Sequence, residues 1–184
     1  MKRKGFFILD FLIGLAVLSL LAAGALPAIS AVSSYTSELE ARAKAQEDAL
    51  FAADYITDRI RYCLDRTQPE PEPIHTYAYG YQDYDENERP NSYWIIAEKK
   101  RWVIKLYNGR QQPITGESSD GTDPKYALEN FRGNGEILPY FTIYPHGLVR
   151  ISYRVARVTP AVSYDMTTSI LPLRDYFLVG EPYD

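Results

Sequence analysis

Residues 5–29 read GFFILDFLIGLAVLSLLAAGALPAI, and this apolar run organises the rest of the chain. The part from Phe11 to Ile29 is about 19 residues long, or roughly 28 Å as a helix at 1.5 Å per residue. That length is close to the thickness of the hydrocarbon core of a bilayer. Because a helix satisfies its own backbone hydrogen bonds, it can cross that core alone. The run therefore predicts a membrane helix.

Charged residues mark both the start and the inside of this run. Lys2, Arg3 and Lys4 precede it, and basic residues tend to stay on the cytoplasmic side, so the rest of the chain should lie outside the cytoplasm. Asp10 lies inside the run. An acid costs about 2.5–3.5 kcal/mol at the centre of a membrane helix and less near the interface. A chain that only needs an anchor has no reason to carry it.

Together these features resemble the type IV prepilin signal. Gly5 is followed by four apolar residues that begin with Phe6, then by an acid, and then by an unbroken apolar run, so the acid is in fifth place counting from Phe6. In type IV pilins and the pseudopilins of type II secretion, a prepilin peptidase cuts after the Gly and the new N-terminal Phe is methylated. The resemblance implies cleavage between Gly5 and Phe6 and N-methylation of Phe6. It covers residues 1–30 and departs from the family at Asp10, where Glu is usual.

The same resemblance implies roles for two further positions. Pro27 matches the Pro that the family often carries about two thirds along the span, and it should bend the helix because it removes a backbone donor. In such filaments the acid, here Asp10, is thought to meet the N-terminal amine of a neighbouring subunit. The implied partners are the prepilin peptidase, other pilin or pseudopilin subunits and an inner-membrane assembly platform. Residues 49–61 also look like the second helical segment of J-type minor pseudopilins and of a competence counterpart.

Two other interpretations of the N-terminus compete with this one. An ordinary signal peptide would have a basic start, an apolar core of about 7–15 residues and a small-residue cleavage site. Residues 22–25 and 28–31 resemble such sites, but the apolar run is longer than that core and contains Asp10. A plain single-pass anchor is the other alternative, and Asp10 also counts against it.

Composition indicates one anchor followed by one domain. The 184 residues carry 20 Lys and Arg against 24 Asp and Glu. Without Lys2, Arg3, Lys4 and Asp10, 17 basic and 23 acidic residues remain, so the exported part carries −6 and a uniformly basic nucleic-acid surface is not expected. The single cysteine, Cys63, excludes an internal disulfide and is expected to act as a small buried hydrophobe.

We divide the chain into a leader at 1–5, a hydrophobic helix at 6–34, an amphipathic helix at 35–66 and a β-rich head at 67–184. Apolar residues recur at spacings of three and four after residue 37 and predict one buried helix face. Three alternating prolines at positions 69, 71 and 73 then end the helix. The residues expected on the buried face are Leu39, Ala43, Ala49, Leu50, Ala53, Ile56, Ile60, Cys63 and Leu64.

From residue 74 the pattern changes to the period of two that is typical of strands. Tyr77, Tyr79 and Tyr81 alternate with smaller residues, and residues 98–101 read as a hairpin turn. A long N-terminal helix followed by an antiparallel sheet is the α+β class, which the pilin resemblance also implies. Strands are expected at 93–97, 102–107, 141–144, 148–158 and 176–179, with one short helix at 125–131. The strands at 141–144 and 148–158 should form a second hairpin around residues 145–147.

No pattern of catalytic residues, cofactor-binding loop or metal spacing stands out. His75 and His146 have no partner at metal-ligand spacing, so surface histidines are expected. Glu117 with residues 120–123 offers oxygen ligands for calcium but lacks EF-hand spacing, and a solvated loop is favoured. The tyrosines at 77–84 could stack on sugars or pack against a partner, but we favour the interpretation that they are ordinary strand residues. Five basic residues could contact nucleic acid or an acidic partner, but we favour a solvated face for them. They are Lys99, Lys100, Arg101, Lys105 and Arg110.

The sequence therefore predicts a structural protein rather than an enzyme, without cofactor, metal or nucleic-acid partner. We expect a minor pilin or pseudopilin of a type IV pilus, a type II secretion system or a competence filament. It would be inserted once in the inner membrane, with its C-terminal domain outside the cytoplasm, and would then enter a filament. The alternative is a membrane-anchored or secreted binding domain for DNA or a glycan.

Overall fold

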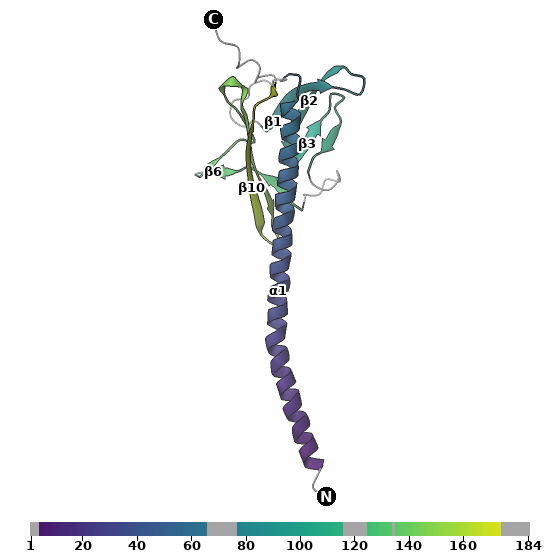
Figure 1. The fold of residues 1–184 in the computed structure, drawn as a ribbon, viewed down its shortest axis with the longest axis vertical. Coiled ribbons are helices and arrows are strands. Elements are labelled where there is room, and N and C mark those ends of the chain that lie inside the picture. The colour runs from purple at the N-terminus through teal and green to yellow at the C-terminus, as the bar shows by residue number, and fades with distance from the viewer. Residues whose placement is uncertain (1–3, 66–76, 116–124, 134, 174–184) are drawn as a thin grey trace. The chain divides into compact units, whose positions relative to one another are not determined.

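The computed structural model describes residues 4–65, 77–115, 125–133 and 135–173. One long helix is followed by antiparallel β-sheets (Figure 1), so the predicted α+β class is confirmed. Contacts divide the chain into two compact units, Met1–Glu40 and Ala41–Asp184. We refer to residues 41–184 as the head and describe the two units separately.

Helix α1 spans Lys4–Arg61 and is 58 residues long. In the first unit, every side chain from Ile8 to Ser37 is exposed. The helix is continuous through Pro27. Its ribbon curves in its purple N-terminal part without a break (Figure 1), so Pro27 is accommodated inside the helix.

In the head, α1 buries a stripe made mostly of alanines. Ala45, Ala49 and Ala52 have no exposed surface, and Ile56 and Ile60 continue the stripe at the same spacing. The predicted face was partly wrong: its later members are buried, but Leu39, Ala43, Leu50 and Leu64 are exposed, while Ala41 is buried. Small alanine side chains let the sheets approach the helix backbone closely, and the larger leucines are left outside that contact.

The helix ends at Arg61, earlier than the predicted residue 66. The chain then joins the first sheet, because the Leu64 amide donates to the Gln82 carbonyl at 2.9 Å. The Gln82 amide donates in turn to the Asp65 carbonyl at 2.8 Å. Arg59 and Arg61 lie in the last turn, where cations interact favourably with the helix dipole.

The first sheet has the order β1-β2-β3-β4 and is antiparallel throughout. Glu98 pairs with Arg101, so the predicted hairpin at 98–101 is confirmed and turns through Lys99 and Lys100 alone. Tyr79 and Tyr81 are buried as the period of two predicts, but Tyr77, the third tyrosine of that pattern, is exposed and lies outside β1. Its strands are β1 (Ala78–Tyr84), β2 (Pro90–Glu98), β3 (Arg101–Lys105) and β4 (Gln111–Pro113).

The second sheet is built on β9 (Val149–Arg157). The predicted hairpin around residues 145–147 is confirmed, since Ile143 pairs with Val149 across the short helix η1 (Pro145–Gly147). The order is β10-β9-β5, and β8 also pairs with β9. The other strands are β5 (Ala127–Glu129), β8 (Phe141–Ile143) and β10 (Val162–Ile170), and β6 (Arg132–Gly133) pairs with β7 (Glu136–Ile137) as a separate ribbon.

The prediction of a short helix at 125–131 was wrong. Residues 127–129 form β5 and pair with Arg154–Ala156 of β9. Leu128 is buried, and its amide donates to the Lys100 carbonyl at 2.7 Å, which joins the second sheet to the first hairpin. Long-range pairing thus determines the conformation of a segment too short to form a stable helix by itself.

Strand β10 was not predicted, and the strand expected at 176–179 lies outside the described residues. Along β10 the even-numbered positions are the more buried ones, from Val162 to Ile170. These positions face the same side as Val155, Tyr153 and Ile151, their partners on β9.

Both sheets and the helix share one core. Trp102 is fully buried, and its ring contacts Tyr140, Phe141 and Tyr153 with centroids 5.3, 5.4 and 5.4 Å apart, all edge-on. Each such aromatic pair contributes about 0.5–1.5 kcal/mol beyond area burial. In Figure 1, β2 and β3 lie on one flank of the blue part of α1 and β10 on the other.

Candidate functional site

The first unit presents an apolar surface along α1. From Ile8 to Ile29 the large hydrophobic side chains are more than half exposed, and Leu20 reaches 74%. This is a helix near the N-terminus that is long and apolar enough to cross a membrane. Removing apolar surface from water is favourable by roughly 25 cal/mol per Å², so the segment is suited to lipid or to the apolar side chains of other helices.

Two hydroxyl groups of the first unit have partners within the helix. Ser19 donates through Oγ to the Leu15 carbonyl at 2.7 Å, and Thr36 donates through Oγ1 to the Val32 carbonyl at 2.9 Å. Each bond returns to the preceding turn, a common arrangement for Ser and Thr in helices. These polar groups therefore need no water.

Asp10 differs from its surroundings, because it is the only charged residue between Ile8 and Ser37. Its side chain is exposed on α1. Phe6 and Asp10 both lie in this helix, four residues apart, which places them one turn apart on the same face. An amine created at Phe6 by cleavage after Gly5 would therefore lie close to the Asp10 carboxylate. Cleavage and methylation themselves stay predictions.

The small residues of the segment leave its surface open. An added Cβ at Gly14 or Gly24 would meet nothing within 4 Å. Another helix could approach the α1 backbone closely at these points, as small residues allow in membrane proteins. The bend expected at Pro27 stays a prediction.

The other candidates from the sequence do not form a site in the described part of the chain. Cys63 is buried, as predicted, and its Sγ lies 3.2 Å from the Ile60 carbonyl. The described residues contain no group of metal-ligating side chains. His75, Glu117 and residues 120–123 lie outside the described residues, and His146 belongs to η1.

The basic residues at 99–110 do not form one patch. Lys99 and Lys100 are exposed at one end of β3, whereas Lys105 is at its other end, 6.0 Å from the centroid of a Trp94 ring. Arg101 is buried, with 7% of its surface exposed. The expectation of a solvated face is therefore wrong for Arg101. The exposed lysines lie at opposite ends of β3 and do not form one surface for nucleic acid.

A group of tyrosines does come together in the head, and sequence reasoning missed it. Tyr81 and Tyr84 of β1 line hollows on the surface with Tyr55 of α1 and Tyr93 of β2. The sequence suggested that the tyrosines at 77–84 could stack on a ligand, but the tyrosines that lie beside them come from two other elements, α1 and β2. Only the fold, which pairs Tyr81 with Tyr93 across β1 and β2, brings these side chains together.

No protein-family model matches the chain, and neither does any curated protein or any solved structure. The resemblance to prepilins therefore rests on residues 1–30 and on the architecture. A long apolar N-terminal helix followed by an antiparallel β-domain is compatible with a pilin-like protein.

Proposed function

We propose that this protein is a structural subunit, a minor pilin or pseudopilin, of a filament in a type IV pilus, a type II secretion system or a competence system. The observation that carries the proposal is Asp10, one carboxylate in an exposed apolar helix segment that is otherwise uncharged up to Ser37. An anchor alone does not need this group, and a lone carboxylate among apolar groups is costly.

The proposed assembly gives the segment two successive environments. The precursor would cross the inner membrane once, with the head outside the cytoplasm. Prepilin peptidase would cut after Gly5, and the new N-terminal Phe6 would be methylated. An assembly platform would then move the subunit into a filament, where α1 segments of neighbouring subunits replace lipid around its apolar surface.

Asp10 would act in that transfer by pairing with the amine of Phe6 on a neighbouring subunit. Two opposite charges that meet in an apolar interior compensate part of each other's desolvation, whereas removing one leaves the other uncompensated. The charge pair would therefore favour one register of packing between adjacent helices. Residues 49–61 resemble the second helical segment of J-type minor pseudopilins, and for this reason we propose a minor subunit rather than a major one.

The head supports a structural role because it has its own core. The buried residues from Ala41 to Ile170 come from α1 and from both sheets. A domain that folds around one core can cover the outside of a filament while the apolar segment packs inside it. The proposal requires no catalytic group in the head.

Mass spectrometry of the mature N-terminus tests the proposal in cells with a prepilin peptidase. We expect a chain that begins with N-methylated Phe6. Gly5→Val should leave full-length precursor in the membrane, because a side chain at that position blocks the peptidase. Gly14→Val is the matched control, since an added side chain there meets nothing within 4 Å.

Three results would contradict the proposal. A mature chain that starts near Ala25 or Ser30 would indicate a secreted domain released by signal peptidase. An intact N-terminus in the native host would indicate a plain anchor. Normal shortening of Gly5→Val would exclude cleavage at Gly5.

A further inference from the structure

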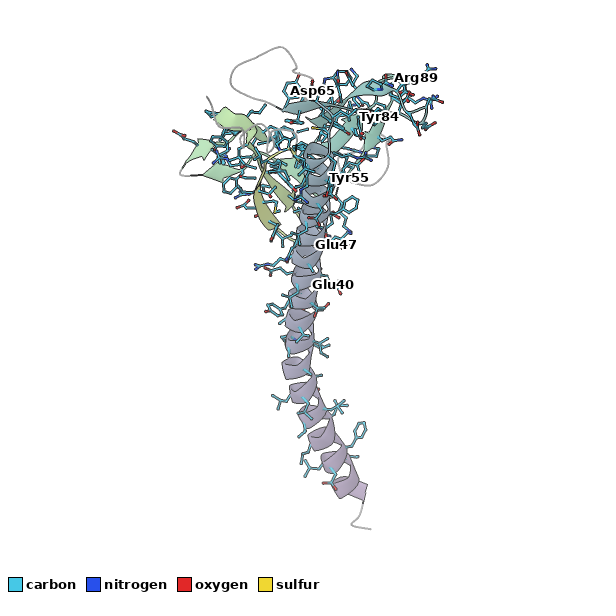
Figure 2. The ribbon with its side chains drawn as sticks, turned by 45° about the horizontal axis from the view of Figure 1, so that its top comes forward. Glu40, Glu47, Tyr55, Asp65, Tyr84 and Arg89 are labelled. Carbon is cyan, nitrogen blue, oxygen red and sulfur yellow. The ribbon has the colours of Figure 1, made fainter. Side chains whose placement is uncertain are left out.

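A surface groove runs between the C-terminal part of α1 and the first sheet of the head. It consists of two adjoining hollows of about 310 and 190 Å³, which share Tyr55, Arg59 and Asp83. Tyr55 comes from the helix and Tyr84 from the sheet (Figure 2). We call this feature the tyrosine groove; its aromatic lining is Tyr55, Tyr62, Tyr81, Tyr84 and Tyr93.

The rings of the groove support each other and leave faces open to solvent. Tyr81 and Tyr93 are stacked with centroids 5.6 Å apart, and Tyr107 meets Tyr93 edge-on at 5.9 Å. Tyr62 and Tyr84 are 64% and 57% exposed. The inner rings are thus held by contacts with one another, and the exposed outer rings present their faces to a partner.

The charges that line the groove are predominantly negative. Among the described residues, four acids line it, namely Asp58, Asp83, Asp85 and Glu86, together with one cation, Arg59. Burial raises the pKa of Tyr81, and Asp83 raises it further. The pKa of Tyr93 is raised by burial and by the same aspartate. The groove therefore combines aromatic faces with a negative potential.

Part of this negative charge is already used by the protein itself. Oδ1 of Asp85 accepts the amides of Asn87 and Arg89 at 2.9 and 2.8 Å, and Oδ2 accepts Nδ2 of Asn91 at 2.9 Å. Asp85 thus fixes the turn between β1 and β2. Asp58 is exposed but lies within 3.9 Å of Nη1 of Arg61. Glu86, which is also exposed, is better placed to meet a ligand.

Arg59 shows which chemistry the groove accepts. Its Cζ lies 5.4 Å from the Tyr55 ring centroid, and its Nη1 lies 3.2 Å from Oδ2 of Asp83. A guanidinium is thus held by an aromatic face and a carboxylate together. Cations over tyrosine or tryptophan rings are attracted by about 0.5–1 kcal/mol at exposed sites and more when desolvated.

We propose that the tyrosine groove binds a segment of a partner protein through its Lys and Arg side chains. The ammonium or guanidinium groups would lie over Tyr62 and Tyr84 and pair with Glu86. Negative potential favours a cationic segment, repels nucleic acid and gives a neutral sugar no advantage. The inference does not depend on the proposed filament function, because every lining residue belongs to the head.

The test uses the full-length protein in uncharged detergent micelles and a short fluorescein-labelled peptide of alternating arginine, lysine and glycine. Fluorescence anisotropy should show binding that weakens as salt is added, because exposed charges are screened. The same peptide with glutamate in place of the basic residues should not bind. Maltohexaose should neither bind nor displace the basic peptide.

Two substitutions locate the binding in the groove. Tyr84→Ala and Glu86→Gln should each weaken binding of the basic peptide about twofold to fivefold, as expected for the loss of one exposed cation–aromatic or charge contact. Tyr77→Ala is the matched control, because Tyr77 has the same 57% exposure and lies just outside β1. Glu136→Gln controls for the loss of one exposed acid.

Circular dichroism confirms that each variant is folded. Equal affinity of the groove variants and their controls would overturn the proposal. Binding of maltohexaose that is lost in Tyr84→Ala would also overturn it, and would assign the groove to a glycan. Failure of the basic peptide to bind the wild-type protein would contradict it directly.

Discussion

Tyr153 of β9 donates its hydroxyl hydrogen to the Ala49 carbonyl of α1 at 2.6 Å, across 104 residues of sequence. Both residues are fully buried. The bond ties the second sheet to the helix in the middle of the alanine stripe. Burial also raises the pKa of Tyr153, so its hydroxyl stays protonated and can donate.

We expect Tyr153→Phe to destabilise the head by about 0.5–1.5 kcal/mol, the usual net contribution of one buried hydrogen bond. The loss should be no larger, because within α1 the Ala49 carbonyl also accepts the amide four residues later and is not left without a partner. Denaturant unfolding followed by tryptophan fluorescence measures the difference. Tyr62→Phe, at an exposed position, is the control and should change little. A Phe variant as stable as the wild type would mean that the hydroxyl contributes nothing.

The head should fold without the apolar segment. The buried residues begin at Ala41, so a fragment of residues 34–184 keeps the whole alanine stripe. We expect it to be soluble, to show a mixed α and β circular dichroism spectrum and to unfold cooperatively on heating. A fragment of residues 56–184 lacks Ala41, Ala45 and Ala49 and should not fold. Aggregation or disorder of the longer fragment would mean that the boundary is wrong.

The turn between β2 and β3 holds two lysines in left-handed backbone conformation, which glycine and asparagine adopt more readily than lysine. Lys99 and Lys100 have φ values of 49° and 58°, and Glu98 pairs with Arg101, as in a two-residue type I′ hairpin. Such turns prefer Asn-Gly, because left-handed backbone is costly for most residues with a side chain.

Replacing Lys99-Lys100 by Asn-Gly should therefore stabilise the head by about 1 kcal/mol. Replacing both lysines by alanine removes the same charges but keeps the unfavourable backbone, so it serves as the control. Midpoints of urea unfolding separate the two variants. Equal midpoints would show that the lysine side chains, rather than the backbone, determine the stability of this turn.

Periodicity predicted the elements whose sequence pattern is strong. The apolar run, the alternating tyrosines of β1 and the two hairpins at 98–101 and 143–149 were found because burial imposes a period on large side chains. The buried face of the helix was predicted less accurately. Leu39 and Leu50 dominate any hydrophobic pattern, yet the sheets pack on alanines, whose small size matters more than their hydrophobicity.

Strand β10 shows why the rest was missed. It carries the alternation of a strand, but polar Ser, Thr and Asp fill most of its positions, so the pattern does not stand out. Arg154 and Asp165 pair across β9 and β10, with Nε and Oδ1 2.5 Å apart. That contact depends on a register which the sequence does not display. The tyrosine groove has the same origin, since its rings come from α1 and the residue after it, from β1 and from β2.

The proposed role of Asp10 can be tested by changing its charge and its length separately. Asp is one methylene shorter than the Glu usual in prepilins, which changes its reach by about 1.5 Å, roughly one covalent bond. Asp10→Glu keeps the charge and should still assemble. Asp10→Ala should be cleaved normally but should remain mostly in the membrane, because docking needs the charge and cleavage does not.

The measurement compares sheared filaments with membrane fractions in cells that express each variant. Mass spectrometry of the same fractions confirms that Phe6 is the mature N-terminus in all of them. If charge pairing guides assembly, the Ala variant should be depleted from filaments, because an unpaired Phe6 amine on the neighbour would bear its full desolvation cost. Equal incorporation of the Ala variant would contradict the pairing. It would instead favour a subunit at the filament tip, which has no neighbour ahead that requires the carboxylate.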